Sequence, residues 1–157
     1  MCRYALNEFA AAHQAFEEAL FHARRTSETL EDRIQVAEIL NNLGCLAYMC
    51  GNPVAALGFY RDAMDVQFRA LSDSLYTGSP ILGQSISLNI SITRANIGFI
   101  KLVTKDLSVA ITALENALME QQILLRGAHE TIIATMDHLA VSRLLNGDQE
   151  QASLVRN

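Results

Sequence analysis

Apolar positions in this chain recur every three to four residues, the spacing of amphipathic helices. The clearest stripe runs through Leu40, Leu43, Gly44 and Ala47. It ends at Gly51-Asn52-Pro53, where the glycine can adopt a left-handed conformation, the asparagine can cap a helix and the proline fits a first helical turn. The pattern therefore predicts one helix over residues 37–50 and a second that starts at Pro53.

The second helix carries small residues on its inner face, at Ala56 and Ala63, with Tyr60 between them. Small residues let two backbones approach closely, so these two segments predict a tight helical hairpin. The same signature recurs as Ala12-Phe16-Ala19 and Ala110-Leu114-Ala117, with Ala152 near the end, and Leu43-Gly44 is matched by Ile97-Gly98 and Leu139-Ala140. Thr77-Gly78-Ser79-Pro80 predicts a break between two hairpins.

Composition supports an all-α fold. The 157 residues include only 2 Pro and 8 Gly, and 50% of them are hydrophobic. A chain with so few helix breakers favours long helices over many short strands, and this length suits a single domain.

The Leu-Gly pair, the Gly-polar turn and the small–aromatic–small signature resemble the tetratricopeptide repeat (TPR) over nearly the whole chain. Repeat spacings of about 42 residues exceed the roughly 34 of ordinary TPRs. With Ile39-Leu40-Asn41-Asn42-Leu43-Gly44 and Gly127-Ala128-His129-Glu130, they look like the kinesin-light-chain type. The resemblance implies a right-handed superhelical solenoid of antiparallel helix pairs. The repeats would be a partial one at 1–25, repeats at 37–75 and 80–126, and a partial one at 129–157, with Lys105 and Ala140 where the pattern has glycine.

In such a solenoid the first helix of each pair lines a concave groove that binds a peptide segment of a partner. The residues that the resemblance assigns to this groove are Glu38, Asn41, Asn42, Cys45, Tyr48, Ala95, Asn96, Phe99, Asp137, His138 and Val141. Repeated amides such as Asn42 and Asn96 can donate to and accept from a peptide backbone. Lys and Arg are absent from these positions, so a clamp for an acidic C-terminal carboxylate is not expected. The expected function is a non-catalytic interaction scaffold; the alternative is a structural spacer or oligomerisation segment of a larger signalling or motor-associated protein.

Charge and targeting signals narrow the partners. Twelve basic against 17 acidic residues give a net charge of −5, which disfavours nucleic acid. No run approaches the roughly 18 apolar residues of a membrane span, so no membrane partner is expected. Neither a signal peptide nor an even set of cysteines occurs, and we expect a cytoplasmic protein.

No motif for catalysis, cofactor binding or metal binding is found. Cys45 and Cys50 are five residues apart, so on a helix their side chains point about 140° apart and cannot share a tetrahedral site. His129 and His138 lie nine apart, unlike the i, i+4 pair of a metalloprotease helix. We therefore expect no enzyme activity, no cofactor and no metal.

The ends of the sequence carry a further expectation. An Asn7-Glu8 turn would leave only residues 1–6 for a first helix, and the last second helix would stop soon after Ala152. Because solenoids need polar capping helices, we expect a fragment of a longer array that self-associates through uncapped ends.

Overall fold

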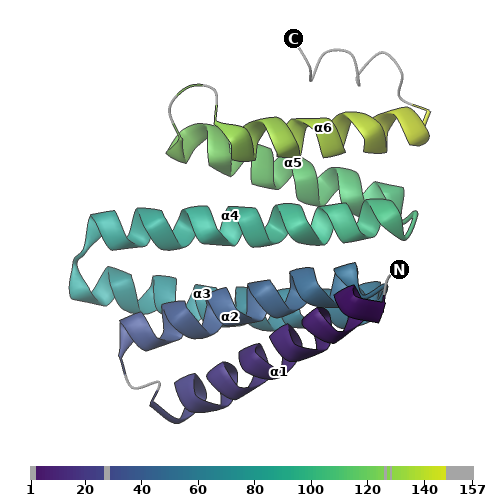
Figure 1. Ribbon diagram of the computed structural model, residues 1–157. Helices are drawn as coiled ribbons and strands as arrows, with labels where there is room; N and C mark the ends of the chain where they lie inside the picture. The colour runs from purple at the N-terminus through teal and green to yellow at the C-terminus, as the bar shows by residue number, and fades with distance from the viewer. Residues whose placement is uncertain (1–2, 27–28, 126, 128, 148–157) are drawn as a thin grey trace. The chain divides into compact units, whose positions relative to one another are not determined.

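A computed structural model describes residues 3–26, 29–125, 127 and 129–147 of the chain. Within these residues it is all-α, with helices α1 (Arg3–Thr26), α2 (Leu30–Met49), α3 (Pro53–Thr77), α4 (Pro80–Val103), α5 (Leu107–Leu124) and α6 (Glu130–Leu145) and without strands (Figure 1). The chain divides into two compact units, Met1–Pro80 and Ile81–Asn157. The division falls at the break that the sequence predicted before residue 80.

In the first unit, α2 packs antiparallel to both α1 and α3 (Figure 1). The core comprises Leu20, Val36, Ile39, Leu40, Leu43 and Ala63, with Phe16, Phe59 and Val66 packed against it. On α3, the predicted inner-face residues Ala56, Tyr60 and Ala63 are all buried, as predicted. Ala19 of α1 is exposed and Leu20 is buried in its place, whereas Phe16 does pack against the core, so the α1 copy of the signature is only partly matched.

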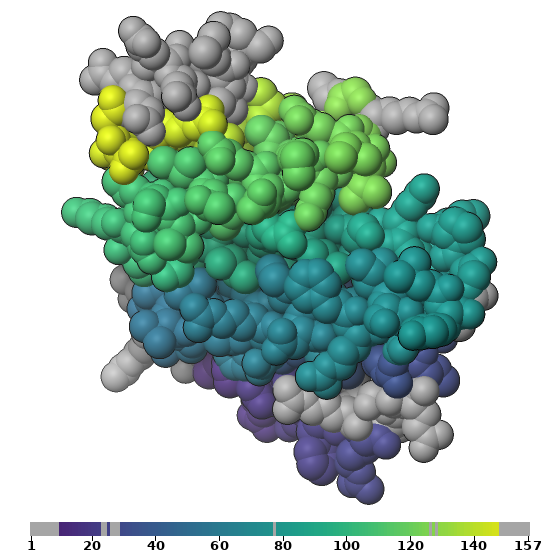
Figure 2. Space-filling view, turned by 180° about the vertical axis from the view of Figure 1, so that it is seen from behind, coloured from purple at the N-terminus to yellow at the C-terminus, as the bar shows by residue number. Residues whose placement is uncertain are grey.

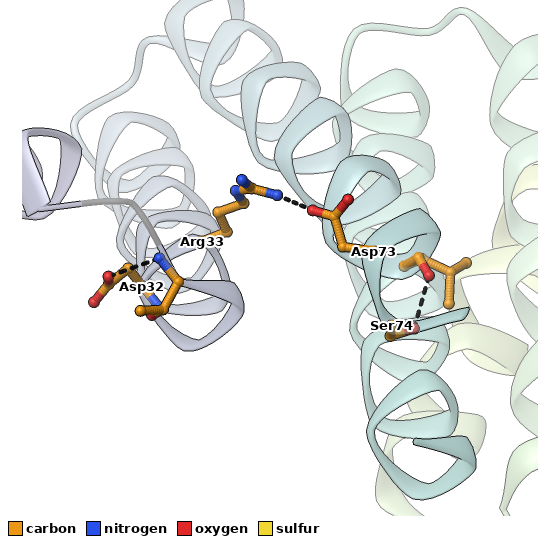
Figure 3. Close-up of polar contacts among 6 residues, drawn as sticks. Asp32, Arg33, Asp73 and Ser74 are labelled. Atoms are coloured by element: carbon orange, nitrogen blue, oxygen red, sulfur yellow. Dashed lines mark hydrogen bonds and ion pairs between the residues drawn. The ribbon is translucent and has the colours of Figure 1, made fainter. Parts of the chain in front are cut away.

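The start of α2 is fixed by a reciprocal cap. The Thr29 side chain accepts a hydrogen bond from the Asp32 backbone N–H, and the Asp32 carboxylate accepts one from the Thr29 N–H, both at 3.2 Å. Close by, Arg33 forms an ion pair with Asp73 of α3 (Figure 3). The capping box makes Leu30 the first residue of α2, so the helix begins seven residues before the predicted residue 37.

The turn between α2 and α3 has the predicted conformation. Gly51 has φ 81°, the Asn52 side chain accepts a hydrogen bond from the Ala55 N–H at 3.0 Å, and Pro53 is the first helical residue. The Asn52 N–H also donates to the Ala47 carbonyl at 2.9 Å, which closes the end of α2.

In the second unit, α5 is antiparallel to α4 and α6, and the atoms of α5 and α6 lie against each other (Figures 1 and 2). Ala95, Leu114, Ala117 and Leu139 form a buried cluster. The turn between α4 and α5 has the same closing backbone hydrogen bond as the turn between α2 and α3: the Asp106 N–H donates to the Lys101 carbonyl, five residues earlier, at 2.9 Å. Lys105 takes the place of Gly51 and has φ 63°, so the departure from the repeat pattern changes the residue but not the backbone.

The predicted turn at Asn7-Glu8 is wrong. α1 is continuous from Arg3 to Thr26, since neither Asn nor Glu breaks a helix as Pro does and no glycine lies nearby. Residues 3–26 are therefore one helix instead of the end of one helix and the start of another. The expected last second helix, which would carry Ala152, lies outside the described residues.

Candidate functional site

On α2, the predicted groove residues differ in exposure. Glu38, Asn42 and Cys45 are exposed, whereas Asn41 and Tyr48 are half-buried. The Asn41 side chain donates a hydrogen bond to the Ala37 carbonyl at 3.2 Å, within its own helix. The predicted groove residues of α2 that are exposed therefore offer a ligand a carboxylate (Glu38), an amide (Asn42) and a thiol (Cys45).

Cys45 is held by the core of the hairpin. The buried Tyr60 hydroxyl donates a hydrogen bond to Cys45 Sγ at 3.2 Å. Burial, followed by this hydrogen bond, raises the pKa of Tyr60 far above its usual range, so the hydroxyl remains protonated. Cys50 ends α2, and its N–H donates to the Leu46 carbonyl at 2.9 Å. Neither cysteine forms a disulfide. Cys45 is linked to α3 through Tyr60, whereas Cys50 lies at the C-terminal end of α2.

Two predicted residues from different helices meet in the second unit. The rings of Phe99 on α4 and His138 on α6 lie 4.6 Å apart between centroids, with an angle of 35° between their planes. Desolvation lowers the pKa of His138, and the negative charge of Asp137 partly opposes this shift. The imidazole is therefore held in its neutral, stacked form at neutral pH. The sequence assigned both residues to one surface, but it gave no sign that they touch.

The remaining predicted residues of this unit divide between surface and core. Asn96 is half-buried, and Asp137 and Val141 are exposed. Ala95 is only 8% exposed and belongs to the buried cluster with Leu139 of α6. Ala95 was expected to line an open groove, and the structure places it in the core instead, where its small side chain lets α6 approach α4.

The basic residues of the second unit are engaged elsewhere. Arg94 pairs with Glu120 and Arg143 with Glu115, both on α5, and Lys101 contacts Asp106 at 2.8 Å. These contacts direct the positive charges toward α5 and the turn before it. These three basic side chains are consequently engaged away from the face with Asn96, Phe99 and His138.

The described residues do not form a metal site. Among the described residues, no three His, Cys, Asp or Glu side chains lie close enough to hold a metal ion. His129, which drew attention in the sequence, caps α6, because its Nδ1 accepts a hydrogen bond from the Thr131 N–H at 3.2 Å. A cleft of ≈ 410 Å³ is present, but it lies away from the predicted face and is lined by Arg94, Ser108, Val109, Thr112, Ala113 and Asn116.

Sequence reasoning missed a pair of buried glutamines. Gln67 and Gln121 follow Ala56 and Ala110 by the same interval, and they are 4% and 0% exposed. Both side-chain amide atoms of Gln121 lack a hydrogen-bond partner among the described residues. The recurrence was visible in the sequence, but polar residues at that spacing are usually on the surface.

Comparison with models of protein families and with curated proteins finds no match for this chain. The repeat resemblance therefore rests on the residue pattern and on the helical hairpins. Within the described part of the chain, no helix combines the length and apolarity needed to cross a bilayer.

Proposed function

We propose that this chain is a non-catalytic protein-interaction scaffold of the TPR type, in which the first helix of each pair (α2, α4 and α6) presents side chains to an extended peptide. The resemblance implies stacking into a right-handed solenoid, and the sequence, without a recognisable signal peptide and with an odd number of cysteines, led us to expect a cytoplasmic protein; both belong to the proposal. The two hairpins support it. Gly44 faces Tyr60 and Gly98 faces Leu114 in the same register, as repeats of one unit require.

The contact between Phe99 and His138 carries the proposal. It joins α4 to α6, which are first helices of successive predicted repeats and run in the same direction (Figure 1). Asn96 lies on the same face of α4, one turn before Phe99. An amide beside a stacked aromatic pair provides backbone hydrogen bonding next to an apolar platform, which suits an extended peptide with an apolar anchor.

The charges indicate which peptide fits. Asp137 and Glu38 are exposed acidic groups at predicted positions, while Arg94 and Arg143 pair with α5. An acidic peptide would meet repulsion, so the expected ligand is neutral or basic, with apolar or aromatic side chains for the Phe99–His138 platform.

A displayed library of random peptides, selected against the immobilised protein, tests this proposal. Peptides that it enriches should carry apolar and basic rather than acidic residues. Their affinity should fall at least tenfold with Asn96→Ala or Phe99→Ala, while helicity measured by circular dichroism is retained. Gln122→Ala, on the exposed surface of α5, is the matched control and should leave affinity unchanged. The proposal would be contradicted if the selection enriched no peptides, or if the enriched peptides bound all variants equally.

A further inference from the structure

The outer face of α6 exposes an apolar stripe. Ile133, Val141 and Leu144 are 52%, 38% and 47% exposed, and they lie at i, i+8 and i+11 along the helix. Asp137, at i+4, is the one charged residue in this stripe and is also exposed. These four residues follow one face of the helix over about three turns.

On α4, three of the four equivalent positions are buried and the fourth is half-buried. The equivalents of Ile133, Asp137, Val141 and Leu144, each 42 residues earlier in the sequence, are Ser91, Ala95, Phe99 and Leu102. Ser91 is 0% exposed, and Ala95 and Leu102 are 8% exposed. α6 supplies cover on this side, since its His138 stacks on Phe99 and its Leu139 shares a buried cluster with Ala95.

We propose that the stripe Ile133–Asp137–Val141–Leu144, the outer stripe of α6, docks an amphipathic α-helix of a partner protein that carries apolar residues and one basic residue. The repeat relation argues for a helix, because α4 receives α6 at the equivalent positions. The carboxylate of Asp137 within the stripe argues for a basic residue opposite it. This inference does not rest on the groove proposed above. Asp137 and Val141 are also among the predicted groove residues, but Ile133 and Leu144 are not, and the groove proposal is carried by the contact of Phe99 with His138.

A second copy of this chain fits the stripe poorly. Asp137 lies near the middle of α6 (Glu130–Leu145), so a two-fold pairing of two α6 helices would bring the two Asp137 carboxylates close together. A stable dimer also buries about 800 Å² per partner, and three apolar side chains on one short helix cannot provide that area. A single docked helix needs less, because its apolar anchors carry most of the affinity.

The test uses a hydrocarbon-stapled peptide of about four helical turns, with leucines at i, i+4, i+8 and i+11 and an arginine at its centre. Binding to the full chain is measured by fluorescence anisotropy, with a sequence-scrambled stapled peptide as reference. Leu144→Ser and Ile133→Ser should each weaken binding at least fivefold. Leu75→Ser, which removes an apolar side chain that is 76% exposed on α3, is the matched control and should change nothing.

Reversing the charge at residue 137 and in the peptide distinguishes specific docking from nonspecific hydrophobic binding. Asp137→Lys should weaken binding of the arginine peptide and strengthen binding of a second stapled peptide that carries glutamate in place of the arginine. Asn96→Ala should affect neither peptide, which distinguishes this site from the groove. Equal binding of the scrambled peptide, or equal loss with Leu75→Ser, would overturn the inference. So would a dimer, detected by light scattering, that is lost in Leu144→Ser, since that result would assign the stripe to a second copy.

Discussion

A Cβ atom added at Gly44 would lie 2.6 Å from Cε1 of the Tyr60 ring, so the absence of a side chain at Gly44 is what lets α2 and α3 cross closely. The second unit repeats this relationship with other residues. A Cβ atom at Gly98 would lie 2.7 Å from Cγ of Leu114. In both hairpins a large side chain of the second helix occupies the space that a glycine of the first helix leaves open.

Replacing either glycine with alanine should destabilise its hairpin. In Gly44→Ala and Gly98→Ala the added methyl group overpacks the crossing, and we expect a loss of about 1–3 kcal/mol in the free energy of unfolding. Urea denaturation of each variant measures this loss.

Gly58→Ala provides the matched control. Gly58 is an exposed residue inside α3, and nothing lies within 4 Å of an added Cβ atom. This variant should gain up to about 1 kcal/mol, because alanine favours the helix over glycine. If Gly44→Ala were as stable as Gly58→Ala, the close crossing of α2 and α3 would be wrong.

The hairpins could be predicted from sequence because their determinants are local. The Gly51-Asn52-Pro53 turn lies within three residues, and the small inner-face residues recur with helical spacing. The start of α2 was also local, at Thr29 and Asp32, but the apolar stripe drew attention to later residues. At Asn7-Glu8 a polar pair was interpreted as a turn, although helix α1 accommodates both residues.

The candidate site depended more on packing between helices, which one sequence does not reveal. The contact of Phe99 with His138 requires the register of α4 against α6, and no residue in either helix specifies it alone. Ala95 illustrates the same limit. A small residue suits both an open groove and a close helix contact, and only the position of Leu139 decides between them.

Lys105→Gly should stabilise the second unit. Lys105 has φ 63°, a left-handed conformation that costs a residue with a Cβ atom about 1–2 kcal/mol. Glycine adopts it freely, although it also gains entropy in the unfolded chain, so we expect a net gain of about 0.5–1 kcal/mol. Thermal unfolding measures the gain. The reciprocal change Gly51→Ala, at φ 81°, should lower stability, and a stabilised Gly51→Ala would contradict the account.

Gln121→Met should also raise stability. The Gln121 side chain is fully buried, and neither amide atom has a hydrogen-bond partner among the described residues. A methionine of similar size keeps the packing and removes the cost of desolvating the amide, about 1–3 kcal/mol. Gln122→Met, one residue later and exposed, should change the unfolding free energy by less than about 0.5 kcal/mol. A destabilised Gln121→Met would show that the amide is satisfied in solution.

His138 should make stability depend on pH. Desolvation lowers the pKa of His138 in the folded protein below the ordinary value of about 6.5 that the unfolded chain has. Above that value both states are neutral at this residue and its pKa shift has no effect. As pH falls through 6.5, the unfolded state binds the proton first, so stability decreases until the folded-state pKa is passed.

Urea unfolding at a series of pH values between 7.5 and 5.5, a window above the ordinary pKa of carboxyl groups, measures this decrease. His138→Gln should flatten the slope, because it removes the titrating group while the neighbouring Phe99 remains. Asp137→Asn should steepen it, because the charge of Asp137 raises the pKa of His138 and its removal lets that pKa fall further. The sign of this second effect is specific to a desolvated histidine beside a carboxylate. A slope that His138→Gln leaves unchanged would mean that the imidazole is as well hydrated in the folded protein as in the unfolded chain.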